Sequence, residues 1–232
     1  MQSFLGIVMA FHAAIRTECP PPAVLMGRTS PAAEPLRAAG TVIQIAEGRE
    51  IYAEGDNTEV FYKVVSGVVR TCKFLNDGRR QIAAFHVAGE VFGLEPGTER
   101  QLAAEAVSDC TLISYRRRGI ELMAQKDETI SRQLFQYAMT NLAQAQDHAL
   151  LLARRGAAEK VAVFLLDWQA RSDRQDIIHL AMTRQEIADY LSLTIETVSR
   201  SFSQFERDGV IALSNTRDVR LLDSEALEEL AA

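Results

Sequence analysis

The sequence predicts an α+β protein built from an N-terminal antiparallel β jelly roll, a long dimerisation helix and a C-terminal winged helix-turn-helix. Three observations lead to this prediction: short β-type runs broken by glycine turns, a long helical run without Pro or Gly, and two capped helices followed by a hairpin. Repeated short strands with regular turns are typical of a barrel or jelly roll. We expect four segments: a loosely ordered leader at 1–40, a sensor-like β-roll at 41–126, the dimerisation helix at 127–155 and the winged helix-turn-helix at 156–232.

The composition indicates a folded protein of the reducing cytosol. Of its 232 residues, 47% are hydrophobic and 24% are charged, which is the balance of a globular chain. Cys19, Cys72 and Cys110 are too far apart for a metal cage and too few for a disulfide framework. The apolar run at 1–15 has no Lys or Arg before it, and no apolar run reaches ~20 residues. We therefore expect a cytoplasmic protein without a membrane span or a bound metal.

The net charge of −6 gives no support to nucleic-acid binding. Phosphate contacts, however, need only a few Lys or Arg on one face, and acidic residues farther away than ~8–10 Å are screened by salt. Function therefore has to be argued from local patterns.

The β-type runs between residues 41 and 115 include one turn that is sharper than the others. Asn76-Asp77-Gly78 offers a glycine for the positive φ that a tight hairpin needs. In the leader, prolines at positions 20, 21, 22, 31 and 35 argue against regular structure.

The helical run at 128–155 carries a narrow apolar stripe with spacings of 3, 4, 3, 4 and 3, which is a heptad seam. Such a stripe suits a helix paired with its own copy, and alanines let two backbones approach closely. The alternative is a helix that lies on the core of its own domain. The predicted dimer contacts are Phe135, Ala138, Leu142, Ala145, Ala149 and Leu152.

Beyond a hinge at 154–156, the pattern predicts a helix at 157–171, a strand at 177–180, two further helices, and a hairpin with strands at 210–213 and 219–222. Three helices with a β-wing form a winged helix-turn-helix. Thr183 and Glu186 form a capping box for the first helix of the motif, and Thr194 caps the second.

The second helix of the motif has two faces. Ile195, Val198, Phe202 and Phe205 share one face and are expected in the core, which leaves Glu196, Ser199, Arg200 and Ser203 facing outward. Arg200 can donate to guanine O6 and N7, and Glu196 can accept from cytosine N4. The short side chains of Thr197 and Ser199 can reach a base edge or a phosphate. The alternative is a solvated face with an i,i+4 pair between Glu196 and Arg200.

These segments together resemble the CRP/FNR superfamily of transcription regulators. Residues 183–200 read TRQEIADYLSLTIETVSR, which is similar to the family's helix-turn-helix with E-[TS]-[VI]-x-R on its recognition helix. EGD at 54–56, YKVVSGVVR at 62–70, DGRRQI at 77–82 and FHVAGEVFG at 85–93 resemble the β-roll of the FNR side of the family. The resemblance covers residues 45–222, and within the family the FixK group of oxygen- and nitrogen-fixation regulators looks most similar.

The resemblance implies a homodimeric transcription regulator, mainly an activator and not an enzyme, on an inverted repeat with TTGA-like half-sites. Ile195 stands where the cyclic-AMP-responsive branch has an arginine, so one guanine contact of that branch should be missing. The implied base contacts are Ile195, Glu196, Thr197, Ser199 and Arg200, and the expected DNA-backbone contacts are Thr183, Arg184, Ser203 and Arg217. The implied contacts with RNA polymerase are Asn76, Asp77, Gly78 and Arg79. The regulated genes would concern oxygen limitation or nitrogen fixation.

The same resemblance bears on effectors. Cyclic-nucleotide binders of the family follow their phosphate-binding Arg with Ser or Thr and Ala, whereas Arg100 precedes Gln101 and Leu102. An iron–sulfur cluster needs four thiolates, and the leader holds only Cys19. We expect a regulator without cofactor or small effector. The alternative is a regulator gated by a cyclic nucleotide, by haem on one of His12, His86, His148 and His179, or by thiol oxidation at Cys72 or Cys110.

Two other function classes are disfavoured. A metal-dependent enzyme on a jelly roll needs an HxH motif, which the sequence lacks. A protein–protein adaptor has no need of an outward Glu/Arg pair beside a wing that carries Arg217 and Arg220.

Overall fold

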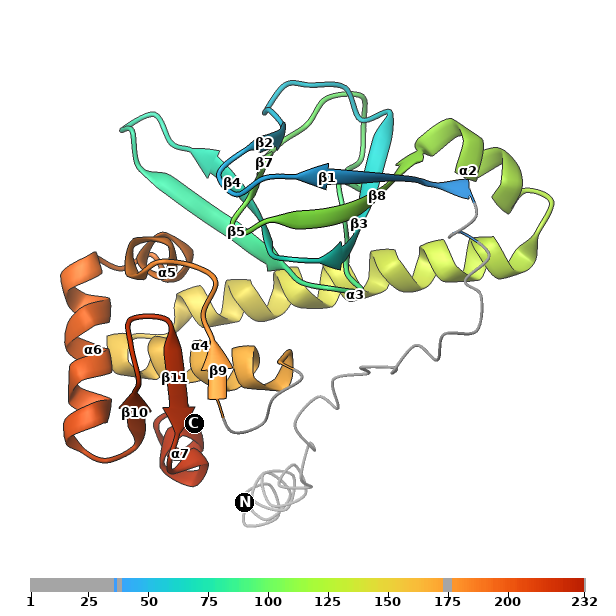
Figure 1. Cartoon of the computed structure of the whole chain (residues 1–232). Coiled ribbons are helices and arrows are strands. Elements are labelled where there is room, and N and C mark those ends of the chain that lie inside the picture. The colour runs from blue at the N-terminus through green and yellow to red at the C-terminus, as the bar shows by residue number, and fades with distance from the viewer. Residues whose placement is uncertain (1–35, 37–38, 173–176, 232) are drawn as a thin grey trace, which may run out of the picture. The chain divides into compact units, whose positions relative to one another are not determined.

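The computed structural model describes residues 36, 39–172 and 177–231 of the chain. Nearly all of the predicted leader, including His12 and Cys19, lies outside the described residues. Figure 1 shows the strands of an N-terminal roll on one side of a long helix, α3, and the C-terminal domain at the far end of that helix.

The N-terminal part is an antiparallel jelly roll, as predicted. One sheet has the order β1-β8-β3-β6 and the other β2-β7-β4-β5. Val64, Phe92 and Leu112 are buried between the sheets, because alternate strand residues point to the same face. The strands are β1 Thr41–Ile45, β2 Glu50–Tyr52, β3 Val60–Ser66, β4 Val69–Phe74, β5 Arg80–His86, β6 Val91–Phe92, β7 Ala103–Ala106 and β8 Cys110–Arg116.

The β4–β5 hairpin confirms the predicted turn. Gly78 has φ +83°, and a Cβ added there would meet nothing within 4 Å, so glycine is needed for its backbone angle and not for space. The Asp77 carboxylate accepts from the backbone N–H of Arg79 at 3.1 Å and closes the turn.

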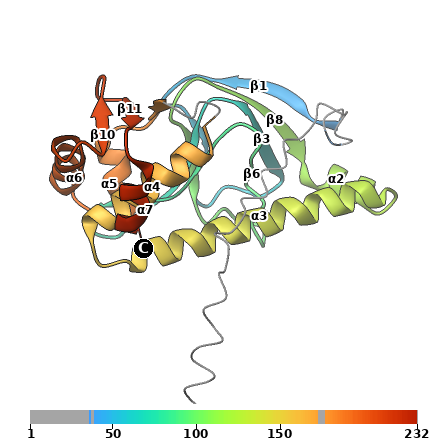
Figure 2. The ribbon, with the colours of Figure 1, turned by 90° about the horizontal axis from the view of Figure 1, so that it is seen from below.

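The long helix α3 spans Glu128–Ala153 and ends two residues before the predicted boundary. Its N-cap is Asp127, whose carboxylate accepts from the Thr129 N–H at 2.9 Å. A short helix, α2 (Arg117–Ala124), precedes it and was not predicted. Figure 2 shows α3 running along one edge of the described part of the molecule, with the roll and α4 on one side of it.

The C-terminal part is a winged helix-turn-helix, as predicted. Its helices are α4 Ala157–Ala170, α5 Arg184–Leu191, α6 Ile195–Arg207 and α7 Ser224–Ala231, and its sheet has the order β10-β11-β9, with β9 Ile177–His179, β10 Ile211–Leu213 and β11 Asp218–Leu221. Phe164, Ile187 and Phe202 are buried in its core. Helix α7 was not predicted; it packs on α4 and buries Leu227.

His86 is a buried polar residue of the roll, which supports a packing role. Its Nε2 lies 3.2 Å from the Thr71 hydroxyl, and its ring stacks on Phe92 with centroids 5.2 Å apart. Burial disfavours the imidazolium, and with the nearby Arg171 guanidinium it lowers the pKa of His86 to about 3.

Acid should therefore destabilise the fold through His86. The unfolded chain takes up a proton near pH 6.5 and the folded chain only near pH 3, so stability is lost as the pH falls through this window. At pH 5 the loss from this group is about 2 kcal/mol. In urea unfolding at pH 7 and pH 5, H86Q should shrink the difference between the two free energies by that amount. An unchanged difference in H86Q would contradict the account.

Candidate nucleic-acid interface

The first helix of the motif, α5, begins with the predicted capping box. Thr183 accepts from the Glu186 N–H at 3.3 Å, and the Glu186 carboxylate accepts from the Thr183 N–H at 2.6 Å and from its hydroxyl at 2.9 Å. Thr183 is exposed, but its hydroxyl proton is engaged by Glu186. This arrangement fixes the end of α5 that is expected to face the DNA backbone.

A tight turn joins α5 to α6. Ser192 adopts the left-handed conformation with φ 53°, and the Leu193 N–H donates to the Ala188 carbonyl at 3.0 Å. The Thr194 side chain then accepts from the Thr197 N–H at 3.3 Å and caps α6, as predicted.

Helix α6 presents the predicted polar face. Glu196, Ser199, Arg200 and Ser203 are exposed, and Thr197 is half-buried. Val198, Phe202 and Phe205 are buried, as expected. The core assignment of Ile195 is wrong: as the first residue of α6 it lies at the edge of the core, with 37% of its surface exposed. Its side chain is therefore partly accessible beside that of Glu196, at the start of α6.

Glu196 and Arg200 are available to a ligand. The Glu196 carboxylate interacts with its own backbone N–H and the Thr194 hydroxyl, which lowers its pKa and keeps it an ionised acceptor. Within the described part of the chain, Arg200 forms no ion pair with Glu196 or another residue. No close ion pair joins the two side chains, but the nearby Arg200 charge also lowers the pKa of Glu196.

Arg184 packs against the recognition helix from α5. Its guanidinium carbon lies 3.4 Å from the centroid of the Phe202 ring, and burial lowers its pKa to about 10. The group stays cationic at neutral pH. A cation over an aromatic face is stabilised by the ring quadrupole, so Arg184 helps to fix α6 on α5.

The wing is the β10–β11 hairpin. The Asn215 carboxamide oxygen accepts from the backbone N–H groups of Arg217 and Asp218 at 2.7 and 2.8 Å and shapes its tip. Arg217 is half-buried and Arg220 exposed.

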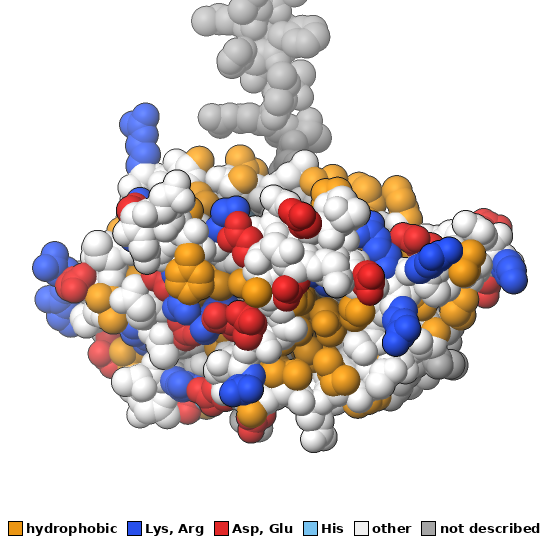
Figure 3. All heavy atoms as spheres, turned by 90° about the horizontal axis from the view of Figure 1, so that it is seen from above, with side chains coloured by type: hydrophobic (Ala, Val, Ile, Leu, Met, Phe, Trp, Pro, Cys, Tyr) orange, Lys and Arg blue, Asp and Glu red, His pale blue; other side chains and the backbone are white. Residues whose placement is uncertain are grey.

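Figure 3, which shows one face of the molecule, has Lys and Arg interspersed with Asp and Glu, so the net negative charge does not form one acidic surface there.

The predicted dimer residues lie along the exposed side of α3, except that Ala145 also lines the cavity beside the roll. Phe135 and Leu142 are 65% and 50% exposed; Ala138, Ala145 and Ala149 are exposed, and Leu152 is half-buried. The opposite face packs on the roll through Ile130, Leu134 and Tyr137. The heptad count did not include Met139 and Leu150, which are 46% and 69% exposed beside the stripe.

Arg100 is committed to the interior of the roll. It is 2% exposed, donates to the carbonyls of Gly93 at 2.7 Å and of Val60, and lies 4.1 Å over the Tyr52 ring. An adjoining cavity of about 290 Å³ reaches from the roll to α3, α4 and α5. In the described residues, no group of three His, Cys, Asp or Glu side chains could hold a metal ion, and no helix is long and apolar enough to span a membrane.

Known proteins match both halves of the chain. A cyclic nucleotide-binding domain model matches residues 42–127, and a Crp-like helix-turn-helix model matches residues 159–230. The nitrogen fixation regulation protein FixK of Azorhizobium caulinodans is 43% identical over 203 residues, which cover 85% of this chain and 82% of that protein. This chain belongs to the CRP/FNR family of transcription regulators.

Other members of the CRP/FNR family support the assignment. FixK of Rhizobium meliloti is 40% identical over 84% of this chain and 90% of that protein. The structure of FixK2 from Bradyrhizobium japonicum superposes with a TM-score of 0.80 at 42% identity, covering 83% of this chain and 98% of that one. The predicted family and fold class are confirmed, and the chain is a DNA-binding regulator of the CRP/FNR family.

The sequence did not predict the contact between the roll and the first helix of the motif. Arg70, Arg80 and Gln81 of the roll contact α5 directly. The only signal for this contact was the charge of the YKVVSGVVR and DGRRQI segments, which does not name a partner.

Proposed function

We propose that this CRP/FNR regulator is a homodimeric transcription activator that binds an inverted repeat with TTGA-like half-sites and needs no small effector. The exposed Glu196 and Arg200 on a capped, rigidly packed α6 carry the proposal. Ile195, Thr197 and Ser199 complete the set of proposed base contacts, and Thr183, Arg184, Ser203 and Arg217 are the proposed backbone contacts. Because relatives are named for nitrogen-fixation regulation, we propose a cytoplasmic, non-enzymatic role in that response or in oxygen limitation.

The dimer is supported by the unpartnered apolar stripe of α3. Phe135 and Leu142 leave most or half of their surface to solvent in the single chain, and the exposed alanines between them permit close helix approach. A two-fold pairing along this stripe presents two copies of α6, whose spacing on DNA should be about 34–36 Å.

The absence of an effector requirement is supported by Arg100. Two of its three guanidinium nitrogens donate to carbonyls and the group lies over an aromatic ring, whereas Nε has no hydrogen-bond partner among the described residues, which leaves little of the group to hold a phosphate. The cavity of about 290 Å³ favours the second candidate, a ligand-gated regulator of the same fold. A gating ligand must bind the active state ~5.5 kcal/mol more tightly to swing a 1:99 population to 99:1.

The DNA affinity of protein from which bound small molecules have been removed distinguishes the effector-free regulator from the ligand-gated one. Purified dimer should bind an inverted-repeat duplex equally well with and without cyclic AMP, and its ultraviolet–visible spectrum should lack haem or iron–sulfur bands. A hundred-fold gain on adding the nucleotide, or a Soret band that tracks activity, would establish the ligand-gated alternative.

The wing should add affinity without sequence preference. Arg217 lies beside the hairpin tip, where it can meet a phosphate. In R217A, affinity for specific and random DNA should fall together, and the slope of log K against log salt should become shallower by ~0.9. A change confined to sequence preference, measured by fluorescence anisotropy at several salt concentrations, would contradict this role.

Contact with RNA polymerase is proposed for the hairpin tip formed by Asn76, Asp77, Gly78 and Arg79. All four are exposed, and Asp77 and Arg79 form an ion pair with each other at 2.7 Å. The D77A/R79A double variant should keep its DNA affinity and lose transcript yield in a purified transcription assay. Unchanged transcription from a promoter that the protein occupies would reject the contact.

A further inference from the structure

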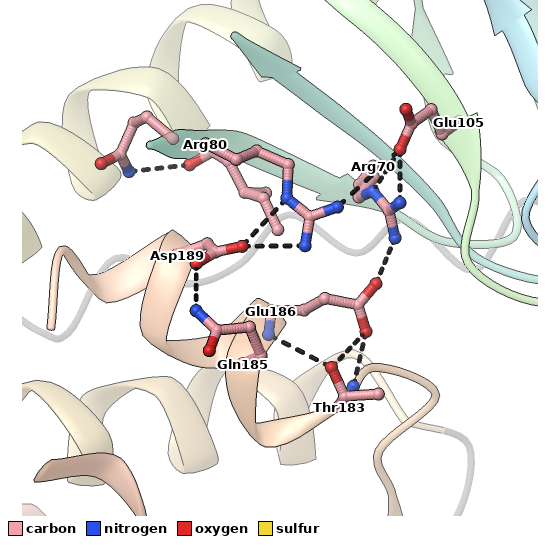
Figure 4. A network of polar contacts seen from close by, with 9 residues as sticks. Arg70, Arg80, Glu105, Thr183, Gln185, Glu186 and Asp189 are labelled. Carbon is pink, nitrogen blue, oxygen red and sulfur yellow. Dashed lines mark hydrogen bonds and ion pairs between the residues drawn. The ribbon is translucent and has the colours of Figure 1, made fainter. Parts of the chain in front are cut away.

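A partly buried network of ion pairs joins the first helix of the DNA-binding motif to the sensor roll (Figure 4). We call this contact between the roll and α5 the dock. Arg70 on β4 pairs with Glu186 of α5, and also with Glu105 of β7, to which its Nε donates at 2.8 Å. Arg80 on β5 pairs with Asp189 of α5 through Nε at 2.9 Å and Nη2 at 2.8 Å. These five side chains are each at most 20% exposed.

Each of the two carboxylates on α5 uses one oxygen for the roll and the other for its own helix. One oxygen of Glu186 contacts Arg70, and the other accepts from Thr183 in the capping box. One oxygen of Asp189 binds Arg80, and the other accepts from the Gln185 amide at 2.7 Å. Charge-assisted pairs with two donors fix geometry as well as separation. Each α5 carboxylate thus links the roll to the helix that supports DNA recognition.

Neutral contacts extend the same dock to the end of α5. The Ser192 hydroxyl donates to the Gln81 side chain at 2.7 Å, and the Gln81 amide donates to the Tyr190 carbonyl at 3.3 Å. The His148 ring, on α3, stacks on Tyr190 with centroids 4.1 Å apart. Contacts therefore run from the first turn of α5 to Tyr190 in its last turn and to its C-cap residue, Ser192.

We propose that Arg70 and Arg80 are positioning residues for DNA binding: through Glu186 and Asp189 they set the angle at which α6 is presented. Helix α5 shares a buried core with α6 through Ile187, Leu191 and Val198, so an α5 held on the roll holds α6 as well. The roll is joined to α3, the proposed dimer helix. The dock therefore fixes the distance and rotation between the two recognition helices of a dimer.

The inference rests on the proposed binding to an inverted repeat, and its signature is selectivity for half-site spacing. Each base pair inserted between half-sites rotates one of them by about 35° relative to the other. A rigid dock should discriminate strongly between the preferred spacing and a spacing two base pairs longer. A loosened dock lets each motif follow its half-site, so the discrimination should shrink.

The experiment measures Kd for two inverted-repeat duplexes that differ by two base pairs in spacing, with wild-type protein, R80Q, D189N and the double variant. R80Q should reduce the ratio of the two Kd values at least ~10-fold, which corresponds to about 1.4 kcal/mol. D189N should do the same, and the double variant should be no worse than either, because one interaction is removed. K73Q removes a charge from β4 at a residue that pairs with Glu54 and not with α5, and should keep the wild-type ratio.

Variants of Arg70 test the same proposal independently. R70K keeps the charge but not the bidentate geometry and should lie between wild type and R70Q in the spacing ratio. Thermal unfolding of each variant shows whether the roll itself is intact. An unchanged ratio in folded R80Q and R70Q, with wild type binding normally, would overturn the positioning role alone, whereas failure of the wild-type protein to bind either duplex would count against the proposed function.

Discussion

Replacing Leu142 with Asp is expected to convert the dimer into a monomer and to lower affinity for the inverted repeat by ~10²–10⁴-fold, the gain that linking two binding modules provides. Leu142 lies at the middle of the exposed stripe on α3, between Ala138 and Ala145. In a two-fold pair, both copies would bring a carboxylate to the seam, and burying unpaired charge there is costly. Since Leu142 is half exposed in the single chain, each domain should still fold.

A matched control on the same helix is T140D. Thr140 is exposed and falls in the heptad position farthest from the seam, so the same charge should leave the dimer and DNA affinity unchanged. Sedimentation velocity and anisotropy measure the two properties. An L142D protein that sediments as a dimer and binds normally would place the dimer interface elsewhere.

R200A and E196A should each weaken binding to the specific repeat by ~1–3 kcal/mol and leave binding to random DNA nearly unchanged, because base-edge contacts carry specificity. Arg200 is exposed and unpaired within the described chain, and Glu196 is held ionised by hydrogen bonds at the start of α6. Specific and random duplexes measured at one salt concentration separate the two effects.

R207A is the control for charge on the same helix. Arg207 is exposed in the last turn of α6, three residues beyond Gln204, whose amide oxygen it contacts at 2.6 Å. Its removal should change both affinities by the same factor. Equal losses on specific and random DNA in R200A would remove Arg200 from base readout.

The recognition motif was predictable from sequence because its signals are local. Thr183 with Glu186, and Thr194 ahead of the apolar spacing of Val198 and Phe202, define both helices within twenty-odd residues. The prediction that Ile195 lies in the core was wrong, because residue spacing assigns a helix face but cannot show that the first helical residue lies at the edge of the core. The exposed stripe on α3 follows from the same kind of periodicity, with its partner outside the single chain.

Short helices and long-range contacts were not predictable. Helices α2 and α7 are only eight residues long and each buries one residue, Ile120 and Leu227, so their apolar pattern is too short to be told from chance, and Gly119 further weakens the helical signal in α2. The dock joins Arg80 to Asp189 across 109 residues and Arg70 to Glu186 across 116. Charges on surface strands give no information about such partners until the fold brings them together.

Selection of bound sites from random DNA by the purified full-length protein, without added effector, tests the central claim most directly. The account predicts enrichment of an inverted repeat with TTGA-like half-sites whose centres lie about 10–10.5 base pairs apart. Recovery of no common sequence, or of a single unrepeated half-site, would contradict it.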